Sequence, residues 1–179
     1  YGWQVIEVDG GEDIAAIGLS SQGISFVPTD ERFLPLSAGI SWLDVRATAE
    51  AAELEARYTR ETLFALTGKH VSPAYMLPKL LWLKRHEPDL FFGARHFLMP
   101  MDYFLARSTG RALTDPTMAG GTMLYDIDAK GYSEELAGEL GIPLQALPEI
   151  VPCGTRAGTL NVETADAMGL DGTVAVAVG

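Results

Sequence analysis

Short apolar runs stand near both ends of this chain, and helical segments fill most of the part between them. The runs contain β-branched residues and are bounded by turn residues, which predicts strands over residues 14–20, 24–28, 35–42, 158–162 and 173–178. Helices are predicted over residues 47–56, 59–66, 75–86, 101–108, 133–140 and 163–168, with one further turn over 144–147. Strands interspersed with helices indicate an α/β domain, and 179 residues suffice for a single domain with its own core.

Charge and composition exclude several classes of partner. The formal net charge of −11 would repel a phosphate backbone, so we expect no nucleic-acid partner. No apolar run approaches the roughly 20 residues that cross a bilayer, so we expect no membrane span. Cys153 is the only cysteine, which permits no intramolecular disulfide and fits the reducing cytoplasm, where we expect the protein. The histidines His70, His86 and His96 lack metal-ligand spacing, so we expect no zinc site.

A tryptophan, a carboxylate and a guanidinium stand at alternate positions where an apolar run ends. These residues are Trp42, Asp44 and Arg46. Side chains at alternate positions of a strand face the same side, so the three side chains can act together. One interpretation makes Trp42 a core residue whose N–H finds a backbone partner. On the same interpretation Asp44 and Arg46 form a structural ion pair that caps the helix starting near residue 47.

Three segments, in this order, resemble the amino-terminal domain of the FGGY family of carbohydrate kinases, which includes xylulokinase, gluconokinase and glycerol kinase. Residues 17–23, "IGLSSQG", match a strand followed by an "SxQ" elbow. Residues 40–46, "ISWLDVR", match a W-x-D-x-R segment, and residues 78–86, "PKLLWLKRH", match part of a K-[apolar]-x-W-[apolar] signature. Shorter pieces at 100–103, 109–110, 114–115 and 121–126 support the resemblance, which covers nearly the whole chain.

The resemblance implies an actin-like (ribonuclease H-like) fold, with a mixed sheet and flanking helices. It also implies ATP-dependent phosphoryl transfer to a sugar or polyol hydroxyl, with Mg²⁺. On this basis residues 1–179 are one domain, a fragment of the sugar-binding amino-terminal domain, and the ATP-side carboxy-terminal domain is absent. The family's first phosphate-binding hairpin is expected before Tyr1, and its catalytic aspartate in a Gly-Gly-x-Asp turn just after Gly179. ATP and Mg²⁺ would be bound mainly outside this chain, which alone would be inactive.

The resemblance further assigns sugar contacts to two segments. The expected substrate-binding residues are Gln22, Gly23, Ile24, Trp42, Asp44 and Arg46. The Trp42 ring would lie against the carbon skeleton of the sugar, while Asp44 and Arg46 would bind hydroxyl groups or brace the pocket wall. Relatives commonly carry Met-His or Arg-Glu where this chain has Gly23 and Ile24, which offer only backbone. The sugar therefore stays open: a ketopentose such as xylulose is the first expectation, and gluconate, erythritol and glycerol are alternatives.

Several other residues are expected to be structural. Trp82 stands among leucines and is assigned to the core, and Lys79 is read as a solvated helix lysine rather than a ligand. Asp102 and Asp115 are expected to cap local structure. Cys153 is expected to be buried or partly buried.

Two other kinds of function stay open from the sequence. The chain could belong to a non-catalytic sugar-binding or regulatory relative that kept the fold, or to an actin-like ATPase or chaperone module. A homodimer is a further open partner state. The helix that precedes the first strand in the family is expected to be shortened, between Trp3 and Asp13.

Overall fold

A computed structural model describes residues 14–179, so the shortened helix expected between Trp3 and Asp13 lies outside the described residues. The first and last strands of the described chain lie side by side in one sheet. β1 (Ala16–Gly18) pairs in parallel with β9 (Ala175–Ala177), and β9 pairs antiparallel with β8 (Arg156–Thr159). The resulting three-stranded sheet has the order β1-β9-β8 and is mixed, as the family resemblance implied.

The other strands form pairs outside this sheet. These pairs are β2 (Val27–Thr29) with β3 (His96–Leu98), β4 (Leu113–Thr114) with β7 (Glu149–Ile150), and β5 (Tyr125–Asp126) with β6 (Gly131–Tyr132). The β4–β7 pair is parallel and the other two are antiparallel. Residues 96–98 are not among the strands predicted from the sequence, and pairing with β2 makes them a strand.

The predicted helices are present with small shifts of their ends. They are α1 (Thr48–Arg57), α2 (Arg60–Thr67), α3 (Met76–His86), α5 (Pro100–Thr109), α7 (Glu134–Leu140) and α8 (Val162–Met168), with a 3₁₀ turn, η2 (Leu144–Ala146). Two short helices that begin with proline were not predicted, α4 (Pro88–Gly93) and α6 (Pro116–Gly120). Local capping fixes several ends: the Thr59 side chain accepts a hydrogen bond from the Thr62 N–H, and Gly68 ends α2 in the left-handed conformation.

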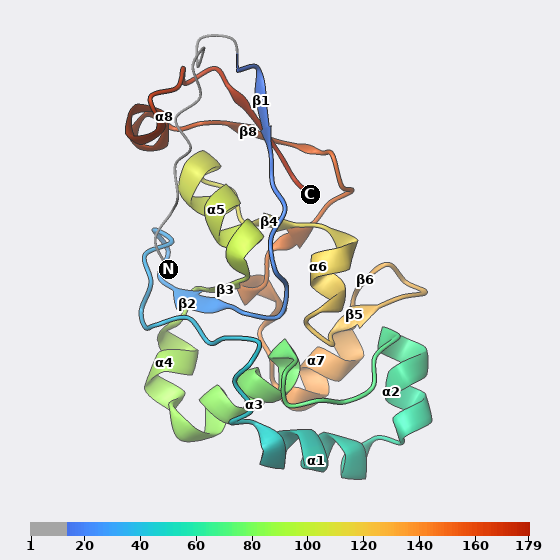
Figure 1. The fold of residues 1–179 in the computed structure, drawn as a ribbon. Coiled ribbons are helices and arrows are strands. Elements are labelled where there is room, and N and C mark those ends of the chain that lie inside the picture. Colours follow the sequence, from blue (N-terminus) through green and yellow to red (C-terminus); the bar gives the residue numbers. More distant parts are fainter. Residues whose placement is uncertain (1–13) are drawn as a thin grey trace.

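The sheet and most helices occupy different ends of the molecule (Figure 1). The β1-β9-β8 sheet lies at one end with α8 beside it, and α5 packs against both β8 and α8. Helices α1 to α4 and α7 lie toward the other end, where α3 packs against α1 and α4. The chain between β2 and α1 connects these two parts and carries the W-x-D-x-R segment.

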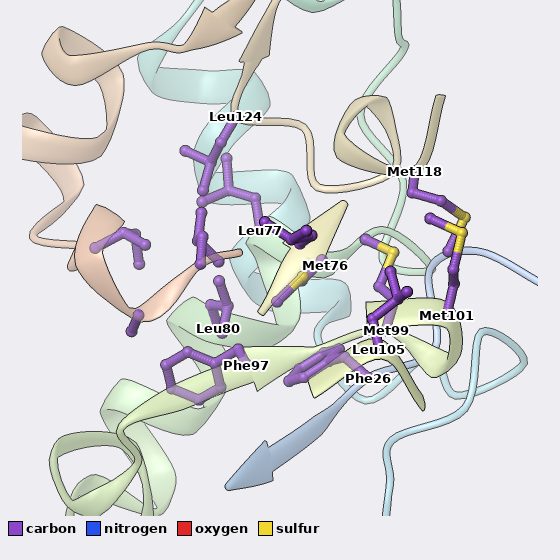
Figure 2. Close-up of a cluster of buried hydrophobic side chains, with 14 of the residues drawn as sticks. Phe26, Met76, Leu77, Leu80, Phe97, Met99, Met101, Leu105, Met118 and Leu124 are labelled. Carbon is purple, nitrogen blue, oxygen red and sulfur yellow. The ribbon is translucent and has the colours of Figure 1, made fainter. Parts of the chain in front are cut away.

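A methionine-rich core lies between α3, β3, α5 and α6. Five of the six methionines are buried, namely Met76, Met99, Met101, Met118 and Met123. Figure 2 shows the side chains of Met99, Met101 and Met118 gathered on one side of this cluster, beside Leu105 and Phe26. Methionine is flexible and polarisable, so it fills irregular gaps beneath a backbone that is not regular. This part of the core supports the polar elbow at residues 22–24.

Candidate functional site

The structure brings the polar elbow and the W-x-D-x-R segment together. The Phe26 N–H donates to the Ile40 carbonyl at 3.1 Å, and the Ile40 N–H donates back to the Phe26 carbonyl at 2.8 Å. The Trp42 N–H donates to Ser25 Oγ at 2.9 Å. Ser25, the residue directly after the elbow, therefore binds the backbone of Trp42. Residues 22–24 thus adjoin residues 40–46 in space.

Ile24 holds the elbow in an unusual backbone conformation. Its φ is +72°, in the left-handed region that a β-branched residue rarely adopts. Such a conformation costs about 1–3 kcal/mol and persists only where surrounding contacts impose it. The Ile24 N–H donates to Met99 Sδ at 3.4 Å, and its Cγ1 lies 3.4 Å from the position that a Cβ on Gly121 would take. Ile24 thus directs its N–H and its side chain toward the methionine-rich core.

The two residues before Ile24 differ in what they can offer a ligand. Gln22 is exposed, and within residues 14–179 its side-chain amide has no hydrogen-bond partner, so that amide is free to bind a hydroxyl group. Gly23 is half-buried, and a Cβ added there would meet only Met118 Sδ at 3.7 Å, an ordinary contact. Position 23 therefore has room for a side chain but presents only backbone.

Trp42 lies at the surface rather than in the core. It is 46% exposed, and its neighbours Leu43 and Val45 are 69% and 58% exposed. The interpretation of Trp42 as a core residue is therefore wrong. A large exposed ring in a segment that adjoins a polar elbow offers an apolar surface that a ligand can cover.

Asp44 and Arg46 form a close ion pair. The Arg46 Nε and Nη2 atoms donate to Asp44 Oδ2 at 2.9 and 2.7 Å, and the Arg46 N–H donates to Asp44 Oδ1 at 2.9 Å. These hydrogen bonds from Arg46 lower the pKa of Asp44. The pair does not cap α1, because the N-cap residue is Ala47 and it receives no side-chain cap. The Asp44 carboxylate keeps lone pairs that can accept a hydrogen bond from a hydroxyl group.

Lys79 lies beneath this segment and is fully buried, so its assignment as a solvated helix lysine is wrong. Its Nζ donates to the Ser41 carbonyl at 2.8 Å. Burial lowers the pKa of Lys79 to about 8, with the charge of Asp44 opposing that shift and the charge of Arg46 adding to it. The sequence held a signal for this burial, because position 79 shares the spacing of the apolar face that Met76, Leu80 and Leu83 form.

Trp82 lies at the edge of the core instead of inside it. Its ring is half-buried, with the Arg46 guanidinium carbon 4.7 Å from the ring centroid. The His86 ring stacks on Trp82 at a centroid distance of 4.9 Å. Trp82 thus joins the core packing of α3 to the Asp44–Arg46 ion pair.

The two carboxylates expected to be caps are caps. Asp102 Oδ2 accepts from the Met99 N–H at 2.9 Å, and Asp115 Oδ1 accepts from the Thr117 and Met118 N–H groups at 2.6 and 3.0 Å. Burial raises the pKa of Asp102 to about 7. Cys153 is exposed, contrary to expectation.

One hollow of the described chain is separate from these segments. It has a volume of about 440 Å³ and lies between α1, α3 and α7. The cations that line it already have partners: Arg57 pairs with Glu139, Arg85 pairs with Glu53, and Lys84 donates to the Leu140 carbonyl. These side chains therefore stabilise the fold through contacts between α1, α3 and α7.

The described residues do not by themselves fit a divalent metal ion. Residues 14–179 contain no group of three or more His, Cys, Asp or Glu side chains that could hold one. Likewise, no helix in that range is long and apolar enough to span a bilayer. Residues 22–24 and 40–46 combine an exposed aromatic ring with an amide, a carboxylate and a guanidinium, which are groups suited to a small polar molecule.

Comparison with known proteins gives consistent matches. Residues 4–179 match the model of the FGGY family of carbohydrate kinases, N-terminal domain. A xylulose kinase from Staphylococcus xylosus is 30% identical over 167 residues, which are 93% of this chain and 35% of that protein. Two solved structures from Lactobacillus acidophilus, a gluconate kinase and a ligand-bound xylulose kinase, each align with a TM-score of 0.88 at 28% identity, covering 96% of this chain and 35% of theirs.

The match fixes the fold as the actin-like fold of that amino-terminal domain. The chain spans about a third of the length of these relatives. The names of the two solved structures differ in the sugar, although both align equally well with this chain. Overall similarity therefore does not select the substrate, and the residues of the site must be considered.

Proposed function

The chain belongs to the FGGY family of carbohydrate kinases, and from this premise we propose that it forms the sugar-binding side of an enzyme that transfers phosphate from ATP to a sugar or polyol hydroxyl. The observation that carries the proposal is the exposed Trp42 ring, in a segment that adjoins the polar elbow through the Trp42 N–H and holds the Asp44–Arg46 ion pair. A sugar presents both an apolar carbon skeleton and many hydroxyl groups, and this combination suits it.

In this role the described residues bind and orient the acceptor. Trp42 lies against the carbon skeleton, and Gln22, Asp44 and Arg46 hydrogen-bond hydroxyl groups. Phosphoryl transfer depends mainly on in-line positioning and on stabilising charge, so a domain devoted to positioning makes a large contribution. We propose that the remainder of a longer protein supplies the ATP site, Mg²⁺ and the aspartate that accepts the proton.

For the substrate we propose a neutral ketopentose such as xylulose. The several xylulose kinases with about 30% identity support this choice. A second support is electrostatic, because gluconate carries a carboxylate that needs a cation. Arg46 is already paired with Asp44, and Lys79 is buried beneath the segment. A neutral sugar needs no cation, so Arg46 and Lys79 can keep the partners that they have.

The test is a panel of sugars with the full-length protein. Xylulose at about 100 times its Kd should stabilise the native state by about 2.7 kcal/mol, seen as a rise in Tm. The same sugar should support ATP consumption in a coupled assay, whereas gluconate, erythritol and glycerol should support less. ATP turnover with gluconate exceeding that with xylulose would contradict the substrate, and no turnover with any sugar would contradict the kinase activity.

The alternative of a non-catalytic sugar-binding relative has one supporting observation. Gly23 and Ile24 present no polar side chain at the elbow. Sugar-dependent stabilisation without ATP turnover would favour this alternative. Residues 1–179 alone should show no turnover on either account, and turnover by this chain alone would refute the division of roles between domains.

A further inference from the structure

The segment that carries Trp42 has little packing of its own. Trp42, Leu43 and Val45 are all exposed, whereas the flanking residues Ile40 and Ala47 are buried. The position of residues 41–46 therefore depends on the contacts that other elements make with their backbone and polar groups. Ser25 holds the Trp42 N–H, and two further contacts come from one helix, α3.

Lys79 makes the first contact, at the start of the segment. Its Nζ donates to the Ser41 carbonyl at 2.8 Å, directly before Trp42. The charged groups that act on this amine are Asp44, which attracts it, and Arg46, which repels it. Burying an ammonium group is unfavourable compared with burying an apolar side chain of similar size. Lys79 therefore does not favour core stability, but its amine supplies a hydrogen-bond donor for the Ser41 carbonyl.

Trp82 makes the second contact, at the end of the segment. The Arg46 guanidinium lies over its ring, with Cζ 4.7 Å from the centroid. This cation–π contact fixes the plane of the guanidinium whose Nε and Nη2 atoms bind Asp44. The stacked His86 ring supports Trp82 from the next turn of α3.

Residues 79 and 82 are three apart in the same helix, so their side chains project from neighbouring positions. We propose that Lys79 and Trp82 are positioning residues for the sugar site, which hold the two ends of residues 41–46 so that Trp42 presents its ring to the substrate. The inference rests on the proposed function, because sugar binding gives this segment its role. Neither side chain touches the sugar on this account.

The test compares two lysines of α3 in the full-length protein. Lys79→Met removes the donor to Ser41 while keeping the length of the side chain. Lys84→Met is the matched control, since the Lys84 amine also donates to a backbone carbonyl, that of Leu140 at 2.9 Å, and makes no contact with residues 41–46. Trp82→Leu removes the ring under Arg46, and Trp82→Phe restores an aromatic face.

Two measurements decide the result. In steady-state kinetics, Lys79→Met and Trp82→Leu should raise the sugar KM about tenfold and leave the ATP KM within about twofold, as expected for loss of one charge-assisted contact. Lys84→Met and Trp82→Phe should stay within about threefold of the wild type. In hydrogen exchange without any ligand, the amides of residues 42–46 should exchange faster in Lys79→Met than in Lys84→Met.

The possible failures can be told apart. A wild-type protein with no sugar-dependent turnover contradicts the proposed function. Unchanged sugar KM and unchanged exchange in folded Lys79→Met and Trp82→Leu, with an active wild type, overturn the positioning role alone. An equal rise in the sugar KM and the ATP KM would mean a general structural role and would also overturn the positioning role. If Lys79→Met does not fold, the Trp82→Leu and Trp82→Phe pair decides.

Discussion

Asp44 and Asp102 are both aspartates that the sequence singles out, and the protein uses them in opposite ways. Asp44 lies in an exposed segment, where Arg46 binds it and lowers its pKa. Asp102 is 1% exposed, caps α5 at the Met99 N–H, and has its pKa raised to about 7 by burial. One carboxylate is held charged and accessible, and the other is enclosed and destabilised in its charged form. Residue type alone therefore does not identify a binding site.

The surroundings of the two carboxylates differ in the same sense. Residues 41–46 have exposed apolar side chains and depend on α3 for their position. The start of α5 lies in the methionine-rich core, beside Met99, Met101 and Leu105. Changes in residues 41–46 should alter sugar binding with little loss of stability. Changes at the start of α5 should lower stability with little effect on sugar binding.

The largest effect is expected from Trp42→Ala. Loss of a central aromatic contact should raise the sugar KM by roughly 30-fold or more. The free energy of unfolding should change by less than about 1 kcal/mol, because the ring is exposed. The control is Leu43→Ala, which removes an even more exposed neighbour and should leave the sugar KM unchanged. Similar sugar KM values for the two variants would remove the distinction between Trp42 and its surroundings.

The reverse effect is expected from Asp102→Ala. Loss of the cap on the Met99 N–H should lower the free energy of unfolding by about 1–2 kcal/mol in denaturant titrations. The sugar KM should stay within about twofold of the wild type, because Asp102 is enclosed in the core. A sugar KM raised as strongly as in Trp42→Ala would place Asp102 in the binding site and break the comparison.

A smaller effect on binding is expected from Asp44→Asn. The amide can still accept a hydroxyl group, but Arg46 and Lys79 lose the negative charge that both of them face. We expect the sugar KM to rise about threefold to tenfold, as for loss of one charge-assisted hydrogen bond. The measurement is steady-state kinetics at low and high salt. A sugar KM below that of the wild type would show that the ion pair opposes binding.

The most specific effect is a dependence of stability on pH. The carboxyl of Asp102 has a folded pKa of about 7 against a usual value of 3.8, so the folded state holds its proton more tightly. Its contribution to stability is therefore full below pH 3.8 and is lost as pH rises to about 7. The groups around it are the Thr114 hydroxyl and the Met99 N–H, the charge of Asp115, and the phenol of Tyr132.

Asp102→Asn isolates this contribution, because the amide oxygen can still cap α5 and does not titrate. The free energy of unfolding of the variant, relative to the wild type, should increase from pH 4 to pH 7. Urea titrations at several pH values measure this difference. A constant difference across that range would mean that Asp102 is charged in the fold, and its contrast with Asp44 would disappear.

Local patterns in the sequence predicted most helices, and contacts between distant residues were harder to foresee. The Thr59 and Gly68 caps mark α2 directly, since each acts within one turn. The short helices α4 and α6 were missed because five or six residues carry too little periodicity. The strand at residues 96–98 depends on its pairing with β2, a partner almost 70 residues away.

The candidate site shows the same limit. Its two segments were identified from their resemblance to a family. The hydrogen bond from the Trp42 N–H to Ser25 Oγ, in contrast, is seen only in the folded chain. The sequence predicts a solvated helix lysine at position 79, whereas the structure buries Lys79. Its partner Ser41 is 38 residues away, and no local pattern indicates such a contact.

A crystal structure of the full-length protein with xylulose would test the central claim most directly. The account predicts that carbon atoms of the sugar lie within about 4 Å of the Trp42 ring, with hydroxyl groups on Gln22, Asp44 or Arg46. A sugar bound elsewhere, with the Trp42 ring facing solvent or another part of the protein, would contradict it.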